Sequence, residues 1–280
     1  MTFLITGARG QVGRAVVERL HAAGLPVRAA SSRPAELPAP AGVETVELVL
    51  DRPETFAAAL RGVRQVFLYP RPGGIHDLVK AAGAAGVEHV VLLSSSSVLA
   101  PGAESDPLAS HSLTVERALA DSALTTTFLR PDAFASNSLG WARSIGHSLP
   151  VQLPYPDAHI APIHPEDIAD VAARALTGDS LTGRSLTLTG SESLTFREQL
   201  AVLSDTLGRA IPVEHISRAE AERQMGRHMP APMVGSLLDL WEGANHRPAA
   251  IGETTETLLG VPARTYRQWT RENAAAFTAE

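Results

Sequence analysis

Cysteine is absent from this chain of 280 residues, and lysine occurs once, as Lys80. Without cysteine the protein cannot form disulfides, use a catalytic thiolate or bind a metal through sulfur, and no metal site is predicted. The absence also fits a reducing compartment, so we expect a cytoplasmic protein.

Long apolar runs and an excess of positive charge are missing as well. No stretch of about 18 apolar residues occurs, so we expect no membrane span. The net charge of −6 argues against a nucleic-acid partner. Because the chain opens directly on an apolar run and a glycine-rich turn, no signal peptide is expected.

The most informative segment is residues 2–20. The apolar run Phe3–Ile5 predicts a buried strand, and three glycines follow with equal spacing: Gly7, Gly10 and Gly13. The next apolar residues recur at helical spacing: Val12, Ala15, Val16, Val17 and Leu20. A strand, a glycine-rich turn and a helix in this order are typical of a dinucleotide-binding motif.

Each glycine of this turn has a physical role. Gly7 permits a tight turn, Gly10 lets a pyrophosphate approach the backbone, and Gly13 lets the helix pack close to the strand. The helix N-terminus offers free N–H groups to the phosphates. The residues predicted to bind the cofactor here are Thr6, Gly7, Arg9, Gly10, Gln11, Val12 and Gly13. The alternative is a structural turn that binds nothing.

Strands and helices alternate over the first 130 residues. The predicted strands cover residues 3–5, 26–30, 43–49, 63–69, 87–93 and 124–129, and the predicted helices cover 12–20, 53–60, 74–85 and 110–122. This alternation predicts an α/β fold with a doubly wound, Rossmann-like parallel sheet and right-handed crossovers. Ligands of such sheets bind at the carboxyl ends of the strands.

Beyond residue 131 the pattern changes. Residues 148–165 are rich in proline and lack periodicity, which predicts a long loop that serves a site. Thr195 and Glu198 form a predicted capping box for a helix that ends at Gly208. The other predicted elements are a helix at 167–176, strands at 185–189 and 211–216, and an amphipathic segment at 265–277.

These patterns predict two regions. A dinucleotide-binding core covers residues 1–150, and a mixed region covers 151–280. In the mixed region, residues 166–190 return to the core, 191–262 form a small, mainly helical substrate lobe, and 263–280 form a C-terminal helix.

The residues after the second predicted strand indicate which nicotinamide cofactor is bound. An acid there would hydrogen-bond the ribose hydroxyls of NAD. This chain has Ser32 and Arg33 instead, and no acid before Glu36. A hydroxyl and a planar guanidinium suit a 2′-phosphate, which Arg9 could also reach. We therefore predict NADP(H); the alternative for Arg33 is a solvated loop charge.

Polar residues also end the next three predicted strands. Asp51 could accept a hydrogen bond from the adenine amino group, or could cap the helix at Pro53. Tyr69 is expected near the nicotinamide ribose. The serines from Ser94 to Ser97 could contact ribose or substrate, or could simply form a turn.

Motifs along nearly the whole chain resemble the atypical short-chain dehydrogenases/reductases of the NmrA-like NAD(P)-binding family. The similar segments are residues 6–13, 94–97, 115–116, 124–137, 163–169 and 188–195. The resemblance implies a Rossmann-like fold and a nicotinamide cofactor. Relatives that it implies include NADPH-dependent quinone and triarylmethane-dye reductases, isoflavone-type reductases and redox-sensing regulators.

The wider superfamily uses a Tyr-x-x-x-Lys pair, which this chain lacks. Its expected places fall near Leu108 and Ser112, and Lys80 precedes the fifth strand. This departure is typical of NmrA-like proteins. We therefore expect an NADPH-dependent oxidoreductase that passes hydride to a small electron-poor acceptor, such as a quinone or a conjugated carbonyl, with positioning supplying most of the catalysis.

Several residues are candidates for the remaining roles. The predicted catalytic residues are His111, Ser95 and Tyr155, and the predicted substrate contacts are Ser96, Phe134, Asn137 and His164. Histidine titrates near neutral pH, although most histidines serve packing or lie at the surface. Phe134 and Trp141 share a helical spacing that also fits a core stripe, and Asn137 could bind a loop backbone instead.

Two other functions stay open at this point. The protein could be a redox sensor that binds NADP(H) without turnover and acts through protein contacts. It could also be an isomerase, dehydratase or cyclase on the same fold. The alanine- and arginine-rich composition is typical of high-GC coding and favours, by analogy, a reductase of secondary metabolism. We expect a monomer or homodimer with a small-molecule substrate.

Overall fold

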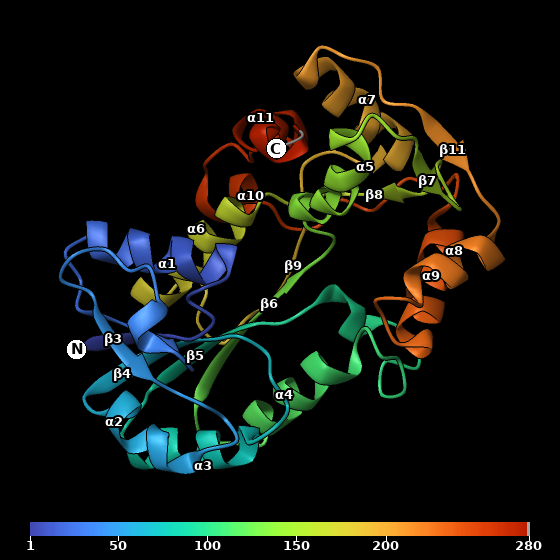
Figure 1. Cartoon of the computed structure of the whole chain (residues 1–280). Helices are drawn as coiled ribbons and strands as arrows, with labels where there is room; N and C mark the ends of the chain where they lie inside the picture. Colours follow the sequence, from blue (N-terminus) through green and yellow to red (C-terminus); the bar gives the residue numbers. More distant parts are fainter. Residues whose placement is uncertain (279–280) are drawn as a thin grey trace. The chain divides into compact units, whose positions relative to one another are not determined.

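The computed structural model describes residues 1–278, which form two compact units (Figure 1). Unit 1 comprises Met1–Ser105, Ala109–Pro131 and Pro165–Thr187. Unit 2 comprises Asp106–Leu108, Asp132–His164 and the described residues from Leu188 onward. No helix within residues 1–278 is long and apolar enough to cross a lipid bilayer.

Unit 1 is built on a seven-stranded sheet in the order β3-β2-β1-β4-β5-β6-β9. Its strands are β1 (Thr2–Ile5), β2 (Val27–Ser31), β3 (Glu44–Glu47), β4 (Val63–Leu68), β5 (His89–Leu93), β6 (Thr125–Pro131) and β9 (Ser185–Leu188). The pairs from β3 through β6 are parallel. At the β6 edge, the N–H of Phe128 donates to the carbonyl of Arg184 at 2.9 Å. The predicted doubly wound parallel sheet is confirmed, and its strand order reverses between β1 and β4.

Helices cover both faces of this sheet (Figure 1). α1 (Gln11–Ala22) and α6 (Pro165–Thr177) pack together on one face, and α2 (Phe56–Leu60), α3 (Ile75–Ala84) and α4 (Ser110–Ala120) lie on the other. Arg19 links the first pair through ion pairs to Glu166 at 2.7 Å and Asp170 at 2.6 Å. The short 3₁₀ turns are η1 (Pro34–Glu36), η2 (Pro53–Thr55) and η3 (Ser96–Leu99).

The predicted helix at 53–60 is divided. Its first turn is the 3₁₀ helix η2, and α2 begins only at Phe56. The hydroxyl of Thr55 donates to the carbonyl of Arg52 at 2.8 Å and accepts the N–H of Val49 at 3.1 Å. These bonds hold the first turn against the loop that follows β3, which the local apolar spacing did not indicate.

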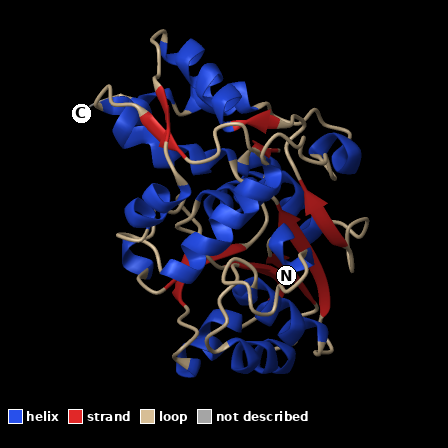
Figure 2. Ribbon diagram, turned by 90° about the vertical axis from the view of Figure 1, so that its right-hand side faces the viewer, coloured by secondary structure: helices blue, strands red, loops and turns tan. Residues whose placement is uncertain are grey.

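Unit 2 is mostly helical, and its strands are short (Figure 2). Its strands are β7 (Val151–Leu153), β8 (His159–Ile160), β10 (Leu194–Thr195) and β11 (Val213–His215). Its helices are η4 (Ala135–Trp141), α5 (Ala142–Gly146), α7 (Phe196–Leu207), α8 (Arg218–Met225), α9 (Ala231–Ala244), α10 (Thr255–Leu259), α11 (Tyr266–Glu272) and η5 (Ala274–Phe277). The capping box of Thr195 and Glu198 is confirmed, and the bonds from Thr195 lower the pKa of Glu198.

Two of the predictions for unit 2 need correction. The segment 148–165 is not wholly irregular, because β7 pairs with β11 and β8 pairs with β10. The amphipathic segment 265–277 is two pieces, α11 and η5, rather than one helix. Residues 279–280 of the predicted C-terminal helix lie outside the described residues.

Aromatic side chains fill the core of unit 2. Trp141 and Trp241 both meet the edge or face of Phe196, with ring centroids 5.9 and 5.2 Å away. Tyr266 stacks on Trp269 at 5.7 Å and its hydroxyl donates to Ser138 at 2.7 Å. Burial raises the pKa of Tyr266. Trp141 therefore packs against the core of unit 2.

Candidate active site

The turn between β1 and α1 is too tightly packed for side chains. A Cβ atom on Gly13 would lie 2.4 Å from the carbonyl oxygen of Gly7. A Cβ on Gly7, whose φ is +63°, would lie 2.9 Å from the Cβ of Tyr69. Gly10 holds the N-cap position of α1 and has no side chain with which to bond the first amides of the helix. These N–H groups therefore face outward as an anion-binding terminus.

Thr6 ties the end of β1 to the end of β4. Its buried hydroxyl accepts the backbone N–H of Tyr69 at 2.7 Å. The ring of Tyr69 lies against Gly7 and is half exposed. The structure thus brings Thr6, Gly7 and Tyr69 together where the strand order reverses, which is where ligands of doubly wound sheets bind.

Arg9 and Arg33 meet at a single carboxylate. Nη2 of Arg9 lies 2.9 Å and Nη1 of Arg33 lies 3.1 Å from Oε2 of Glu36. The hydroxyl of Ser31 accepts the N–H of Arg33 at 3.1 Å and fixes the turn after β2, on which Ser32 is exposed. The two arginines predicted to bind phosphate are therefore neighbours, with an acid between them that the sequence reasoning did not assign.

A buried charged network joins the ends of β5 and β6 to α4. Arg130 donates from Nε and Nη2 to the two carboxylate oxygens of Glu116, at 2.9 and 2.7 Å. The hydroxyl of Ser94 donates to the same carboxylate at 2.5 Å. The guanidinium also lies 5.8 Å from the ring centre of Phe128. The proton of the Ser94 hydroxyl is therefore directed at Glu116, and the predicted contact of Ser94 with the cofactor stays a prediction.

Glu116 is a residue whose role the sequence reasoning missed. In the sequence, Glu116 was noted only as part of a segment that resembles the NmrA-like family. A signal was available, because Glu116 follows Val115 and precedes Leu119 on the buried face of α4. A carboxylate among apolar residues requires a charged or hydrogen-bonding partner, and Arg130 is that partner.

The serine run and His111 lie close in sequence to this network. Ser95 is the N-cap of η3, and its hydroxyl accepts the N–H of Ser97 at 3.3 Å. This is the turn-forming arrangement that was the alternative for these serines. Ser96 is partly exposed at the start of η3, and His111 is exposed in the first turn of α4. Their predicted catalytic and substrate-binding roles stay predictions.

Asp51 is exposed in the loop after β3. The alternative role as a helix cap is wrong, because Arg52 holds the N-cap position of η2. Asp51 instead approaches Gly73, where a Cβ atom would lie 3.0 Å from its Oδ1. Its predicted contact with adenine stays a prediction.

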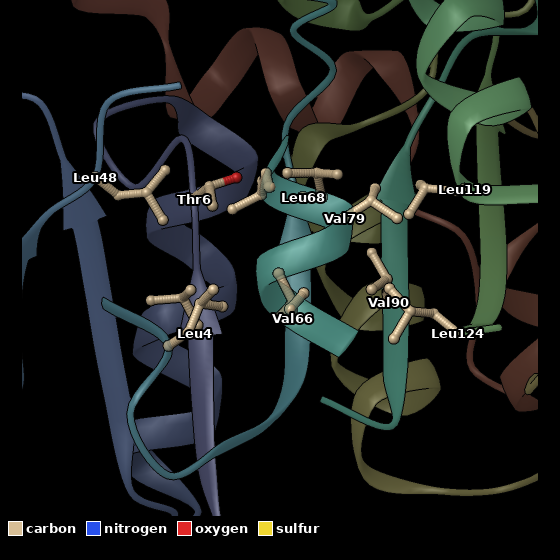
Figure 3. A pocket seen from close by; sticks show the side chains of 12 residues that line it. Leu4, Thr6, Leu48, Val66, Leu68, Val79, Val90, Leu119 and Leu124 are labelled. Carbon is tan, nitrogen blue, oxygen red and sulfur yellow. The ribbon is translucent and has the colours of Figure 1, made fainter. Parts of the chain in front are cut away.

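The cavity drawn in Figure 3 is not a ligand site. Its volume of 10 Å³ is about the smallest that can hold one water molecule. Leu4, Val66 and Val90 from the sheet and Leu78 from α3 line it, so it lies inside the apolar core of unit 1. Its lining reaches Thr6 at the end of β1, but the other lining side chains are apolar, so it is a packing gap between the sheet and its helices.

Three predicted substrate contacts are neighbours in unit 2. Phe134 pairs with Ile163 through a backbone bridge, and the N–H of Asn137 donates to the carbonyl of Phe134 at 3.0 Å. His164, which follows Ile163, is buried, and its Nε2 lies 3.0 Å from Oε2 of Glu272. This pair holds α11 to the segment before α6, a structural role that does not need substrate.

Tyr155, also in unit 2, is engaged by Arg218. The Tyr155 hydroxyl accepts a hydrogen bond from this guanidinium, which also contacts Asp239 at 2.6 Å, Glu242 at 2.8 Å and Glu222 at 3.0 Å. Hydrogen bonds to Asp239 and then Glu222 raise the pKa of Arg218. The ring of Tyr155 packs against the hydrophobic core of unit 2, as Trp241 does. Tyr155 thus belongs to a network that joins α8 and α9.

The sequence profile of the NAD(P)H-binding family matches residues 7–179. The chain belongs to this family. The matched range begins at the first glycine of the β1–α1 turn and ends just after α6, so it contains the glycine turn, the Arg9–Glu36–Arg33 cluster and the network of Glu116.

Relatives of known class agree with this membership. The chain is 39% identical to the (4-alkanoyl-5-oxo-2,5-dihydrofuran-3-yl)methyl phosphate reductase of Streptomyces griseus, covering 99% of each. It is 30% identical to an NAD(P)H azoreductase of Xenophilus azovorans, again over 99% of each. The solved structure of an NADPH-dependent quinone oxidoreductase from Escherichia coli has the same fold, with a TM-score of 0.81, 24% identity and coverage of 97% of this chain and 99% of that one.

These findings confirm the resemblance to atypical short-chain dehydrogenases/reductases. The protein is an NAD(P)H-dependent oxidoreductase of that type. The residues present fit the cofactor class, because Gly7, Gly10 and Gly13 keep the β1–α1 turn free of side chains and because no side chain caps the first amides of α1. Gly7, Gly10 and Gly13 would hold the diphosphate there.

Proposed function

We propose that the protein is an NADPH-dependent reductase that transfers hydride to a small, electron-poor acceptor, a conjugated carbonyl compound or a quinone. The observation that carries the proposal is the pairing of the glycine turn, where no side chain caps the amides of α1, with an α4 helix, SHSLTVERALA, that contains neither tyrosine nor lysine. The turn is suited to hold the coenzyme, and the helix lacks the usual proton donor.

This chain's own residues would divide the coenzyme between them. The glycine turn, from Thr6 to Gly13, would hold the diphosphate through backbone amides. Arg9 and Arg33, with the exposed hydroxyl of Ser32, would bind the 2′-phosphate and so favour NADPH over NADH. Tyr69 would pack on the ribose, and Asp51 would bond the adenine amino group. Bound NADPH supplies a hydride from its nicotinamide ring.

The missing Tyr–Lys pair limits which acceptors can react. A simple ketone needs an acid beside its oxygen while hydride arrives. A quinone or a conjugated enone accepts hydride to give an anion that its own conjugation stabilises, and a proton can follow from water or from a weakly placed group. Of the predicted catalytic residues, His111 and Ser95 are in unit 1 with the coenzyme residues, and we propose them as the groups nearest this step.

The named relatives support an acceptor of this kind. The Streptomyces griseus enzyme is named for an unsaturated lactone that carries an acyl group, which is a conjugated carbonyl compound. The Escherichia coli structure is that of a quinone oxidoreductase, and its likeness to this chain shows the fold alone. The Streptomyces relative also agrees with a role in secondary metabolism. We extend the acceptor class, but not one substrate, to this chain.

Turnover with isotopically labelled coenzyme tests the proposal. Purified protein is mixed with NADPH carrying deuterium at nicotinamide C4 and with a panel of quinones, acyl butenolides and enones. The expected result is coenzyme oxidation, together with deuterium at a carbon of the reduced enone or butenolide. For a quinone, coenzyme oxidation with hydroquinone formation is the readout, because hydrogen on a hydroquinone oxygen exchanges with water. Coenzyme binding without oxidation by any acceptor would favour a redox sensor, and conversion of an acceptor without coenzyme would favour an isomerase; either result contradicts the proposal.

A further inference from the structure

The carboxylate of Glu36 lies where two guanidiniums converge. Arg9 comes from the β1–α1 turn, and Arg33 from the turn after β2, and both contact the same oxygen of Glu36. Two cations from different turns gathered about one anionic oxygen form a small anion-binding site. In the structure this site is filled by an anion that belongs to the chain itself.

The local backbone keeps Glu36 in this place. Arg33 is the N-cap of η1 and Glu36 is its last residue, with the N–H of Glu36 donating to the carbonyl of Arg33 at 3.2 Å. In a 3₁₀ turn, side chains three residues apart lie above one another, so Arg33 and Glu36 face the same side. The buried Leu37 anchors the end of the turn. The backbone of η1 thus holds the Glu36 carboxylate close to Arg33.

The negative charge of Glu36 opposes the binding of a phosphate to Arg9 and Arg33. Arg9, Arg33 and Glu36 together carry a formal charge of +1, whereas the two arginines alone would carry +2. A phosphate monoester carries about −1.5 to −2 at pH 7. All three side chains are well exposed, at 40, 65 and 54%, so their ion pairs are weak and a phosphate can displace the carboxylate.

We propose that Glu36 is a specificity-determining residue that competes with the 2′-phosphate of NADPH for Arg9 and Arg33. Its carboxylate lowers the affinity for coenzymes that carry the phosphate. Coenzymes that lack the 2′-phosphate bind as well with this carboxylate as without it, or better where the carboxylate accepts a hydrogen bond from a ribose hydroxyl. Glu36 therefore narrows the preference for NADPH over NADH. This inference rests on the proposed function only for the place of the coenzyme.

The test is calorimetric titration of the Glu36→Gln variant, which keeps the size of the side chain and removes its charge. The ligands are NADP⁺ and NAD⁺, together with adenosine 2′,5′-bisphosphate and AMP as fragments with and without the 2′-phosphate. We expect E36Q to bind NADP⁺ and the bisphosphate about 3–10-fold more tightly, since tenfold corresponds to the strength of one well-placed charge interaction. NAD⁺ and AMP should bind as before or more weakly.

Two further variants isolate the contact from general charge effects. Glu88→Gln removes an exposed carboxylate that pairs with Arg64 at 3.3 Å just before β5 begins, at the amino end of that strand. It should leave all four affinities unchanged. In an Arg33→Gln background, the gain in NADP⁺ affinity from E36Q should fall by at least half, because one of the two guanidiniums that Glu36 blocks is then missing.

Three results would overturn the inference. One is a ratio of NADP⁺ to NAD⁺ affinity in E36Q within twofold of the wild-type ratio. Another is weaker binding of NADP⁺ by E36Q, which would make Glu36 a support for the arginines instead of a competitor. The third is equal tightening in E36Q and E88Q. Failure of the proposed coenzyme preference gives a different pattern: tighter binding of NAD⁺ by the wild type, with R33Q unchanged for both coenzymes.

Discussion

Two charged clusters lie at the carboxyl ends of the strands in unit 1, and they are built in opposite ways. The cluster of Arg9, Arg33 and Glu36 is open, with side chains 40–65% exposed. The cluster of Ser94, Glu116 and Arg130 is closed, with Glu116 only 6% and Arg130 18% exposed. Exposed ion pairs exchange easily with a ligand, whereas a buried, fully hydrogen-bonded pair does not.

The difference indicates that the two clusters have different functions at the same edge of the sheet. The open cluster, beside the glycine turn, is suited to bind and release an anion. The closed cluster holds α4 against β5 and β6 and fixes the Ser94 hydroxyl. In this account, removing a charge from the closed cluster should damage folding, and removing one from the open cluster should change binding alone.

The largest expected effect is that of Glu116→Ala. It leaves the guanidinium of Arg130 without its partner in a mostly buried place, which costs about 3–5 kcal/mol of unfolding free energy. Denaturant unfolding measures this loss. The matched control is Glu104→Ala, which removes the exposed partner of Arg117 and should leave stability nearly unchanged. Equal effects of the two variants would contradict the distinction between closed and open pairs.

Next in size is the contrast between Gly13→Ala in α1 and Gly83→Ala in α3. The first places a methyl group 2.4 Å from a backbone oxygen, so we expect a loss of about 1–3 kcal/mol in stability and loss of coenzyme binding. The second meets no atom within 4 Å among the described residues and should stabilise the helix by up to about 1 kcal/mol. Thermal unfolding and coenzyme titration of both variants test this. Retained NADPH binding in G13A would contradict the role given to the turn.

Much of unit 1 could be predicted from the sequence because its signals are local. Its apolar strands and the spacing of Gly7, Gly10 and Gly13 each depend on neighbouring residues, as does the capping box at Thr195 in unit 2. The strands β7 and β8 could not be predicted, because they are two or three residues long and exist through pairing with distant segments. The split of the helix at 53–60 likewise depends on bonds of Thr55 to the preceding loop.

The candidate site divides in the same way. The residues of the glycine turn were predictable from a motif, and Arg9 and Arg33 from the chemistry of phosphate. Three other features depend on contacts between separate elements. Glu36 lies between the two arginines, Glu116 pairs with Arg130, and Arg218 donates to Tyr155. Such contacts leave no periodic pattern in one sequence.

A smaller effect is expected from pH, through His89 in β5. Its ring lies between Oε1 of Gln65 at 3.0 Å and the hydroxyl of Thr127 at 2.8 Å, and burial lowers its pKa from the ordinary 6.5. The folded protein therefore keeps this histidine neutral below the pH at which the unfolded chain binds a proton. Since the unfolded state then binds more protons, stability falls as pH drops below about 6.5.

The His89→Gln variant checks this dependence. The unfolding free energy of the wild type should fall more between pH 7.5 and pH 5 than that of H89Q, measured by urea unfolding at each pH. His147→Gln is the control, because His147 is exposed just after α5 and its Nδ1 lies 2.9 Å from the backbone carbonyl of Arg143. A wild type and H89Q with the same pH dependence would show that His89 does not contribute.

The smallest effect concerns the cavity in the core of unit 1. Val90→Ile adds one methylene toward a space of 10 Å³, so stability should change by less than about 1 kcal/mol in either direction. The affinity for NADP⁺ should not change, because the cavity is a packing gap. A several-fold change in that affinity, measured by titration, would connect the cavity to the binding site.

Titration of the wild-type protein with NADPH and with NADH, at low and at high salt, shows whether the glycine turn and its two arginines form a coenzyme site. We expect saturable binding of both coenzymes, with NADPH the tighter ligand and with an advantage over NADH that shrinks as salt screens Arg9 and Arg33. Absence of binding by either coenzyme, or tighter binding of NADH at low salt, would contradict it.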